Sequence, residues 1–196
     1  MKINKEMQKQ LMQQIKLNAE NKGYKIKSNS LYQLRGDNFI HSDYLIVESK
    51  KIIFRIYIKK YSYDNIFWDT MNMKDNKKKN DSLRAIGAFK APSILIKKNE
   101  YELSENVVNL ANQFIEEVEV ASDNFLANNE INMYVLKYEY GQDNKILKCL
   151  AYLDMKQYAQ ANEVARAALG VGDSGRFESE GNSFFEWVLL EKYLKR

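Results

Sequence analysis

Residues 51–60 read KIIFRIYIKK, and the apolar residues in this stretch recur with a period of two. Successive side chains of a β-strand point to opposite sides, so the even-numbered positions share one face. That face carries Ile52, Phe54, Ile56 and Ile58. The alternation predicts a strand with one buried face. The strand must belong to a sheet that other elements cover.

The segments around this strand predict the rest of the sheet and a covering helix. Further strands are expected at residues 30–35, 39–47, 64–71 and 93–98. Residues 4–22 predict a helix, because an apolar residue recurs at every fourth position from Met7 to Ala19 and Gly23 supplies a stop signal. Residues 74–81 contain no apolar side chain and predict an exposed loop. The first part of the chain is therefore expected to be a helix packed on an antiparallel sheet.

Beyond residue 100 the apolar period becomes helical. A helix is expected from Ser104, with further helices at residues 130–139, 144–153 and 157–169. The last helix begins at a capping box, in which Ser183 is followed three residues later by Glu186. The fold class predicted is α+β: an N-terminal helix on a four- to five-stranded, mainly antiparallel sheet, followed by a bundle of four to five helices.

The distribution of charge also changes near residue 100. Residues 1–100 carry 21 Lys/Arg against 10 Asp/Glu, whereas residues 101–196 carry 9 against 16. We therefore expect a basic α+β region over 1–100 and an acidic helical region over 101–196, packed together as one unit. Either the basic region meets an acidic partner or nucleic acid, or the two regions attract each other.

Location follows from the apolar runs and the cysteine content. No apolar run approaches the roughly 18 residues that a membrane span requires, and the N-terminal residues are too polar for a signal peptide. Cys149 is the only cysteine, so the chain cannot form an internal disulfide. These features predict a cytoplasmic protein without a membrane partner.

Asp37 and the triplet Glu48-Ser49-Lys50 lie on an expected hairpin that follows a helix. Residues 1–60 thereby resemble a degenerate form of the PD-(D/E)xK nuclease pattern. In that family two carboxylates hold Mg²⁺ and a lysine orients the attacking water. The resemblance implies a catalytic set of Asp37, Glu48 and Lys50. The chain departs from the pattern because no proline precedes Asp37 and both acidic residues fall in expected turns.

Residues 144–169 carry small and aromatic side chains at positions where two antiparallel helices would meet. These positions are Cys149, Tyr152, Tyr158, Ala161, Ala168 and Leu169. The segment resembles one tetratricopeptide repeat, although Lys156 stands where a turn glycine is common and Ala165 where a bulky aromatic residue is usual. The resemblance implies a helical hairpin, because a concave peptide groove needs about three repeats.

The sequence lacks the residue patterns that usually bind a dinucleotide cofactor or a metal ion. Residues 170–175 match GxGxxG, but a dinucleotide fingerprint must follow a strand, and this one follows an expected helix. Gly170 or Gly172 is instead expected to end that helix. His41 is the only histidine, and Cys149 is expected to be a buried apolar residue. No cofactor and no metal are therefore predicted.

Binding is the leading functional prediction, because no catalytic set is complete. We expect a small bacterial interaction protein that neutralises a toxin or regulates a partner by covering its surface. One alternative is nucleic-acid binding, and another is Mg²⁺-dependent cleavage by the Asp37 set.

Two charged clusters are candidate contact surfaces. Nucleic acid or an acidic partner would meet the basic hairpin, with Tyr57 interleaved among Lys50, Lys51, Arg55, Lys59 and Lys60. A basic partner would meet the acidic helix, through Glu116, Glu117, Glu119 and Asp123.

Overall fold

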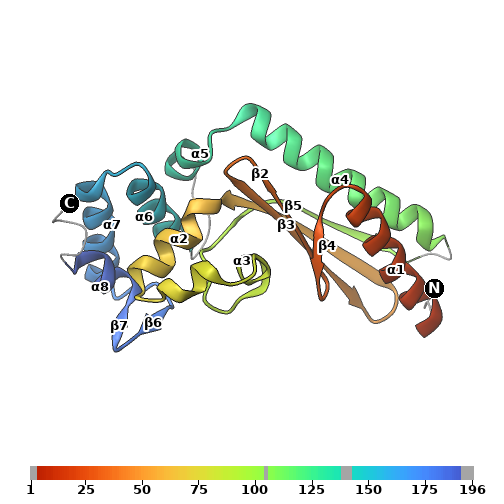
Figure 1. The fold of residues 1–196 in the computed structure, drawn as a ribbon, viewed down its shortest axis with the longest axis horizontal. Helices are drawn as coiled ribbons and strands as arrows, with labels where there is room; N and C mark the ends of the chain where they lie inside the picture. The colour runs from red at the N-terminus through yellow and green to blue at the C-terminus, as the bar shows by residue number, and fades with distance from the viewer. Residues whose placement is uncertain (1–3, 104–105, 138–142, 191–196) are drawn as a thin grey trace. The chain divides into compact units, whose positions relative to one another are not determined.

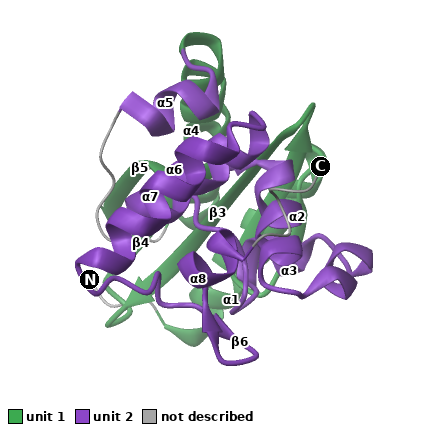
Figure 2. Cartoon of the chain, turned by 90° about the vertical axis from the view of Figure 1, so that its left-hand side faces the viewer, with its two compact units in different colours: residues 1–58, 95–128 green, residues 59–94, 129–196 purple. Residues whose placement is uncertain are grey.

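The structure is a computed structural model that describes residues 4–103, 106–137 and 143–190 (Figure 1). It confirms the predicted α+β class: one helix, five antiparallel strands, and a C-terminal group of helices. The chain forms two compact units, one of residues 1–58 and 95–128 and the other of residues 59–94 and 129–196 (Figure 2). This division does not coincide with the expected boundary at residue 100, because the long helix after that residue belongs with the sheet.

Unit 1 contains the sheet, whose strands follow one another in chain order. Its elements are α1 (Lys5–Asn21), β1 (Lys25–Lys27), β2 (Ser30–Arg35), β3 (Asn38–Val47), β4 (Lys51–Lys60), β5 (Ile94–Glu102) and α4 (Val107–Asn128). Strand β1 pairs only with β2 and is one edge of the sheet. The strands predicted at 30–35, 39–47, 51–60 and 93–98 are all present, and β1 is an addition.

Helices α1 and α4 contact each other, and α4 packs on the sheet (Figure 1). The ring of Phe114 in α4 stacks on Phe54 of β4, with the ring centroids 4.0 Å apart. Phe114 also meets Tyr44 of β3 edge-on at 6.0 Å. The predicted stripe of α1 is buried at Leu11, Ile15 and Ala19. The core of unit 1 therefore lies between these two helices and one face of the sheet.

Unit 2 is mainly helical. Its elements are α2 (Tyr61–Thr70), η1 (Lys74–Lys78), α3 (Ser82–Ile86), α5 (Ile131–Lys137), α6 (Asn144–Asp154), α7 (Tyr158–Gly170), β6 (Glu178–Ser179), β7 (Asn182–Ser183) and α8 (Phe184–Leu189). Phe67 is the centre of an aromatic core, 4.9 Å from Phe177 and 5.5 Å from Phe184 between ring centroids. The predicted capping box is present, with the Ser183 amide donating to the Glu186 carboxylate at 2.7 Å.

The strand predicted at residues 64–71 is wrong, because this segment is part of helix α2. Ile66, Trp68 and Thr70 alternate as a strand would, but Tyr63 and Phe67 are both fully buried and stand four residues apart on one helical face. The expected loop at 74–81 contains the short 3₁₀ helix η1, none of whose residues is buried. Within the described ranges, no helix is both long enough and apolar enough to cross a membrane.

Helices α6 and α7 form the hairpin that was expected over residues 144–169. Cys149 is fully buried and its thiol lies 3.4 Å from the carbonyl oxygen of Ala161. Burial raises the pKa of the Cys149 thiol. The small side chains of Ala161, Ala165 and Ala168 are also buried, which lets the two helices approach closely. Gly170 is the last residue of α7, and Gly172 follows in the left-handed region, as expected for a helix end.

The turn between α6 and α7 places Lys156 at a φ of 61°, a conformation that favours glycine. We expect Lys156→Gly to raise the free energy of unfolding by about 0.5–1 kcal/mol, because relief of the left-handed strain exceeds the entropy that glycine adds to the unfolded chain. Denaturant titration of both proteins measures this difference. Lys156→Ala is the matched control, since it keeps the Cβ atom and the strain. A glycine variant no more stable than the alanine variant would contradict the explanation.

Candidate functional site

The three residues of the predicted nuclease site do not come together. Asp37 lies in the turn before β3, and Glu48 lies in the turn after it. Strand β3 has 10 residues. At a rise of about 3.3 Å per residue the two carboxylates are separated by roughly 30 Å, too far to share a metal ion. Lys50 pairs with Glu48 at 3.7 Å. No group of three or more potential metal ligands occurs in the described part of the chain.

The five basic residues of the predicted hairpin surface do not form one open cationic face. Each has a carboxylate partner: Lys50 with Glu48, Lys51 with Glu100, Arg55 with Asp43, Lys59 with Asp64, and Lys60 with Glu130. The side chain of Lys59 is fully buried. It therefore offers no contact surface to a partner, and the hairpin's positive charge is largely compensated within the chain.

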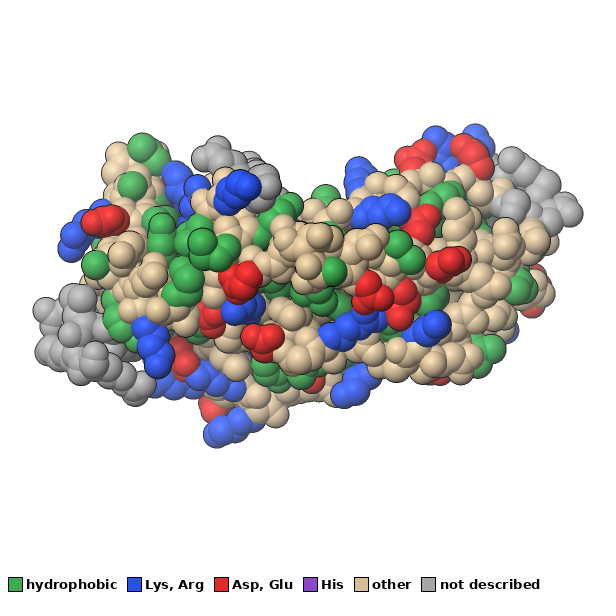
Figure 3. Space-filling view, turned by 90° about the horizontal axis from the view of Figure 1, so that it is seen from above, with side chains coloured by type: hydrophobic (Ala, Val, Ile, Leu, Met, Phe, Trp, Pro, Cys, Tyr) green, Lys and Arg blue, Asp and Glu red, His purple; other side chains and the backbone are tan. Residues whose placement is uncertain are grey.

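The acidic helix is compensated in the same way. Arg35 of β2 pairs with Glu119 and, at 2.6 Å, with Asp123. Lys97 of β5 pairs with Glu117 at 3.3 Å. Of the four predicted acidic contacts, only Glu116 has no such pair with the part of the chain that the structure describes. Acidic and basic side chains lie interspersed on the face seen in Figure 3.

The charge asymmetry of the two sequence halves disappears when the chain is divided by compact unit. Unit 1 holds 13 Lys/Arg against 12 Asp/Glu, and unit 2 holds 17 against 14. The reason is that acidic α4 packs with the basic strands of unit 1. This supports attraction within the chain as the explanation of the asymmetry.

Several tyrosine hydroxyls are protected from ionisation. Burial raises the pKa of Tyr24, which also donates a hydrogen bond to Glu119 at 2.6 Å. Burial likewise raises the pKa of Tyr44 and Tyr63. The hydroxyl of Tyr63 donates to Asn132 at 2.8 Å. The folded chain therefore keeps protons that the unfolded chain releases.

Alkaline pH is expected to destabilise the protein for this reason. Unfolded tyrosines lose their protons above a pH of about 10, so the folded state binds more protons there. The free energy of unfolding then falls by up to about 1.4 kcal/mol per pH unit for each protected tyrosine. Denaturant titrations at a series of pH values from neutral upward measure the free energy of unfolding. The absorbance of tyrosinate at the same pH values measures how many tyrosines have ionised. Ionisation of all tyrosines without loss of structure would contradict the prediction.

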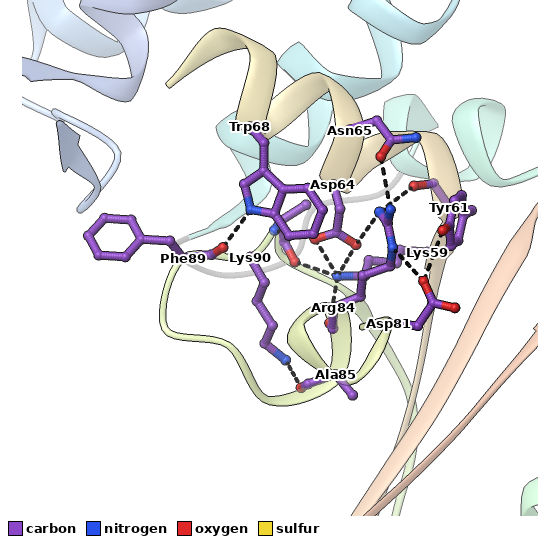
Figure 4. Close-up of polar contacts among 11 residues, drawn as sticks. Lys59, Tyr61, Asp64, Asn65, Trp68, Asp81, Arg84, Ala85, Phe89 and Lys90 are labelled. Atoms are coloured by element: carbon purple, nitrogen blue, oxygen red, sulfur yellow. Dashed lines mark hydrogen bonds and ion pairs between the residues drawn. The ribbon is translucent and has the colours of Figure 1, made fainter. Parts of the chain in front are cut away.

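Unit 2 contains a buried charge cluster around Lys59, Asp64 and Arg84 (Figure 4). The Lys59 ammonium lies 2.8 Å from Asp64, and the Arg84 guanidinium stacks 3.7 Å from the ring centroid of Tyr61. Burial lowers the pKa of Lys59, and Asp64 opposes this shift. The cluster fastens the segment around Arg84 and Ala91 to helix α2. All three charged side chains are almost completely removed from solvent, so the cluster offers little surface to a binding partner.

A groove of about 420 Å³ lies between α1 and strands β1 to β3 of unit 1. Its apolar lining has a floor of Ile15, Leu31 and Tyr44, which are buried, and walls that carry Met12, which is 46% exposed, and the half-buried Ile26. The remaining lining residues are polar or basic: Lys5, Gln8, Lys9, Gln13, Lys16, Ser28 and Ser30. No acidic residue lines the groove among the described residues. The volume falls within the range of about 300–1,000 Å³ that is typical of ligand pockets.

Two of the three lysines that line the groove differ from the hairpin lysines, because they have no ion-pair partner in the described part of the chain. Lys5 and Lys9 form no ion pair with any residue in the described ranges. Among the described residues Lys16 pairs with Glu20 alone, at 3.8 Å between two exposed side chains. Lys25 and Lys27 are also exposed and unpaired within the described ranges, but they alternate with Ile26 along β1 and so lie on the opposite face of the sheet from the groove. The positive charge at the groove itself therefore comes from Lys5, Lys9 and Lys16 of α1.

Local sequence explains how the groove forms. Leu11, Ile15 and Ala19 bury one face of α1. Met12 lies just outside this stripe, and 46% of its surface is exposed. The sequence signal that could have revealed the groove is the position of Met12, an apolar residue that lies beside the core stripe of α1 and between Lys9 and Lys16. The opposite wall comes from β1, which at three residues was too short to predict.

Comparisons with protein-family models, with curated protein sequences and with solved structures find no match for this chain.

Proposed function

We propose that this chain is a non-catalytic protein-interaction protein that binds an acidic segment of a partner protein in the groove beside α1. The observation that carries the proposal is an apolar groove, exposed at Met12 and partly at Ile26, that is bordered by lysines without strong ion pairs. Covering an exposed apolar surface lowers the free energy of the complex, because the surface is removed from water. Unpaired lysines at its border favour a partner with negative charge. No other surface described above combines these two features.

The biological role that we propose is neutralisation of a bacterial toxin or regulation of a partner by covering its surface. Such a role requires binding alone, so it needs no catalytic residues. Nucleic-acid binding through the hairpin at 50–60 receives less support, because those lysines and Arg55 have carboxylate partners within the chain.

Affinity capture from the host lysate, with and without added nuclease, tests this function. The groove variant is Met12→Glu with Lys9→Glu. The control variant, Leu17→Glu with Lys98→Glu, makes the same chemical changes at exposed positions of unit 1 that do not line the groove. We expect a stoichiometric protein that survives nuclease treatment and is lost only with the groove variant. Capture of nucleic acid alone, or of a protein that both variants retain, would overturn the proposal.

A further inference from the structure

We infer that the occupant of the groove is an amphipathic helix with acidic residues flanking its apolar stripe. This inference rests on the proposed function and specifies the form of the partner segment. The helix would lie beside α1, on the sheet face that α1 and α4 already cover. It would complete a layer of three helices on that face.

The groove opens onto the same sheet face as the core. Phe114 of α4 contacts Tyr44 of β3 on this face. The sheet register places Leu31 opposite Ser42, which lies two residues before Tyr44 on the same side of β3. Leu31 and Tyr44 therefore share one face, and both line the groove. The floor of the groove is thus an extension of the surface on which α4 packs.

The groove and α4 meet different sides of α1. The side-chain amide nitrogen of Asn18 in α1 donates a hydrogen bond to the amide oxygen of Asn112 in α4, at 2.7 Å. Met12 instead lines the groove. The two positions are about 120° apart around an axis with 3.6 residues per turn. The groove is therefore the next position for a helix beside α1, rather than a gap between α1 and α4.

The wall formed by α1 has the spacing that a neighbouring helix requires. Lys5, Lys9, Met12 and Lys16 follow one another at intervals of three and four residues. They extend over about 16 Å of helix axis. Rows of side chains with this spacing form the ridges against which a second helix packs. An apolar stripe at matching intervals would meet Met12 and the floor of the groove.

Addition of a partner strand is disfavoured at the other wall. Strand β1 has three residues, and two of them are lysines. Short edge strands with lysine side chains are a device that prevents further strands from pairing. Recognition must therefore depend on side chains in the groove rather than on the backbone of the sheet edge. Lys5, Lys9 and Lys16 favour Glu or Asp beside the partner's apolar stripe, as in paired helices with charged flanks.

Three synthetic peptides of about 18 residues, or five helical turns, test this inference by fluorescence anisotropy with the full chain. The first places leucines at helical intervals with flanking glutamates. The second has the same composition in strict alternation, and the third replaces the glutamates of the first by lysines. We expect only the first to bind, with an affinity that falls at least about tenfold in Met12→Glu/Lys9→Glu, falls with added salt, and is unchanged in Leu17→Glu/Lys98→Glu.

Binding of the alternating peptide as tightly as the helical one would overturn the inference, and so would failure of the helical peptide to bind. Preferential binding of anionic phospholipid vesicles would also overturn it, in favour of a lipid surface. A different result would refute the proposed function: a partner protein that the groove variant still captures from the lysate. A partner lost with that variant, together with no binding of the helical peptide, would refute the helical form alone.

Discussion

Replacing Asp64 by alanine is expected to lower the free energy of unfolding by about 3–5 kcal/mol, because it leaves a buried ammonium without its carboxylate. Both side chains of the Lys59–Asp64 pair are fully buried, and their charged atoms lie 2.8 Å apart. The Lys59 ammonium also donates to the carbonyl oxygens of Arg84 and Ala91, at 3.0 Å each. These two bonds cannot replace the lost negative charge.

Asp64 also orders the chain that follows α3. Its carboxylate accepts a hydrogen bond from the Ala91 amide at 2.8 Å. The alanine variant would therefore leave this buried amide unsatisfied, which adds to the loss. Denaturant titration of the variant and the parent protein measures the combined effect.

Two further variants test the cause of this loss. Asp75→Ala removes an aspartate from an exposed pair with Lys78, whose side chains are 93% and 85% exposed, and should change stability little. The double variant Lys59→Met/Asp64→Leu should recover the part of the loss that comes from the unpaired ammonium, because apolar side chains can replace a buried ion pair, while the part that comes from the unsatisfied Ala91 amide remains. A loss below about 1 kcal/mol in Asp64→Ala would contradict the role given to the pair.

Phe114→Ala is expected to lower the free energy of unfolding by about 3–5 kcal/mol, because it opens a cavity between α4 and the sheet. Phe114 is fully buried, and its stacking on Phe54 joins the helix to strand β4. Phe114→Leu should lose less, since it fills part of the same space. Val120→Ala is the matched control on α4, because 51% of Val120 is exposed. Equal losses at positions 114 and 120 would contradict this account of the core.

The strands and α1 could be predicted from sequence because each buries one regular face. The alternation in residues 51–60 corresponds to β4, in which Ile52, Phe54, Ile56 and Ile58 are buried. The capping box at Ser183 was equally readable, since both partners lie within one turn. Local pattern is sufficient where the residues that decide a structure are close in the chain.

Helix α2 was mistaken for a strand because its buried residues are not all apolar. Asp64 is fully buried beside Phe67, so hydrophobicity alone gives no clear helical period. The partners that stabilise this aspartate are Lys59, five residues before it, and the distant segment around Ala91. Their convergence is a property of the fold that no local pattern contains.

The pairing of charges on the predicted contact surfaces could not be read from the sequence for a similar reason. Arg35 and Glu119 are 84 residues apart in sequence, yet they form an ion pair. The sequence shows that both charges exist, but it does not show that they compensate each other. The groove was missed because its walls come from α1 and the three-residue β1, and because its lysines look no different in sequence from paired ones.

The most direct test of groove binding is site-specific photocrosslinking in the native host. A photoreactive amino acid is placed at Met12 in the groove and, in a separate protein, at the exposed Leu17 outside it. The account predicts a crosslinked partner protein from position 12 and none from position 17, with the crosslink in an acidic segment of the partner. Equal crosslinking from both positions, or a crosslink from position 17 alone, would contradict the assignment of the groove as the binding site.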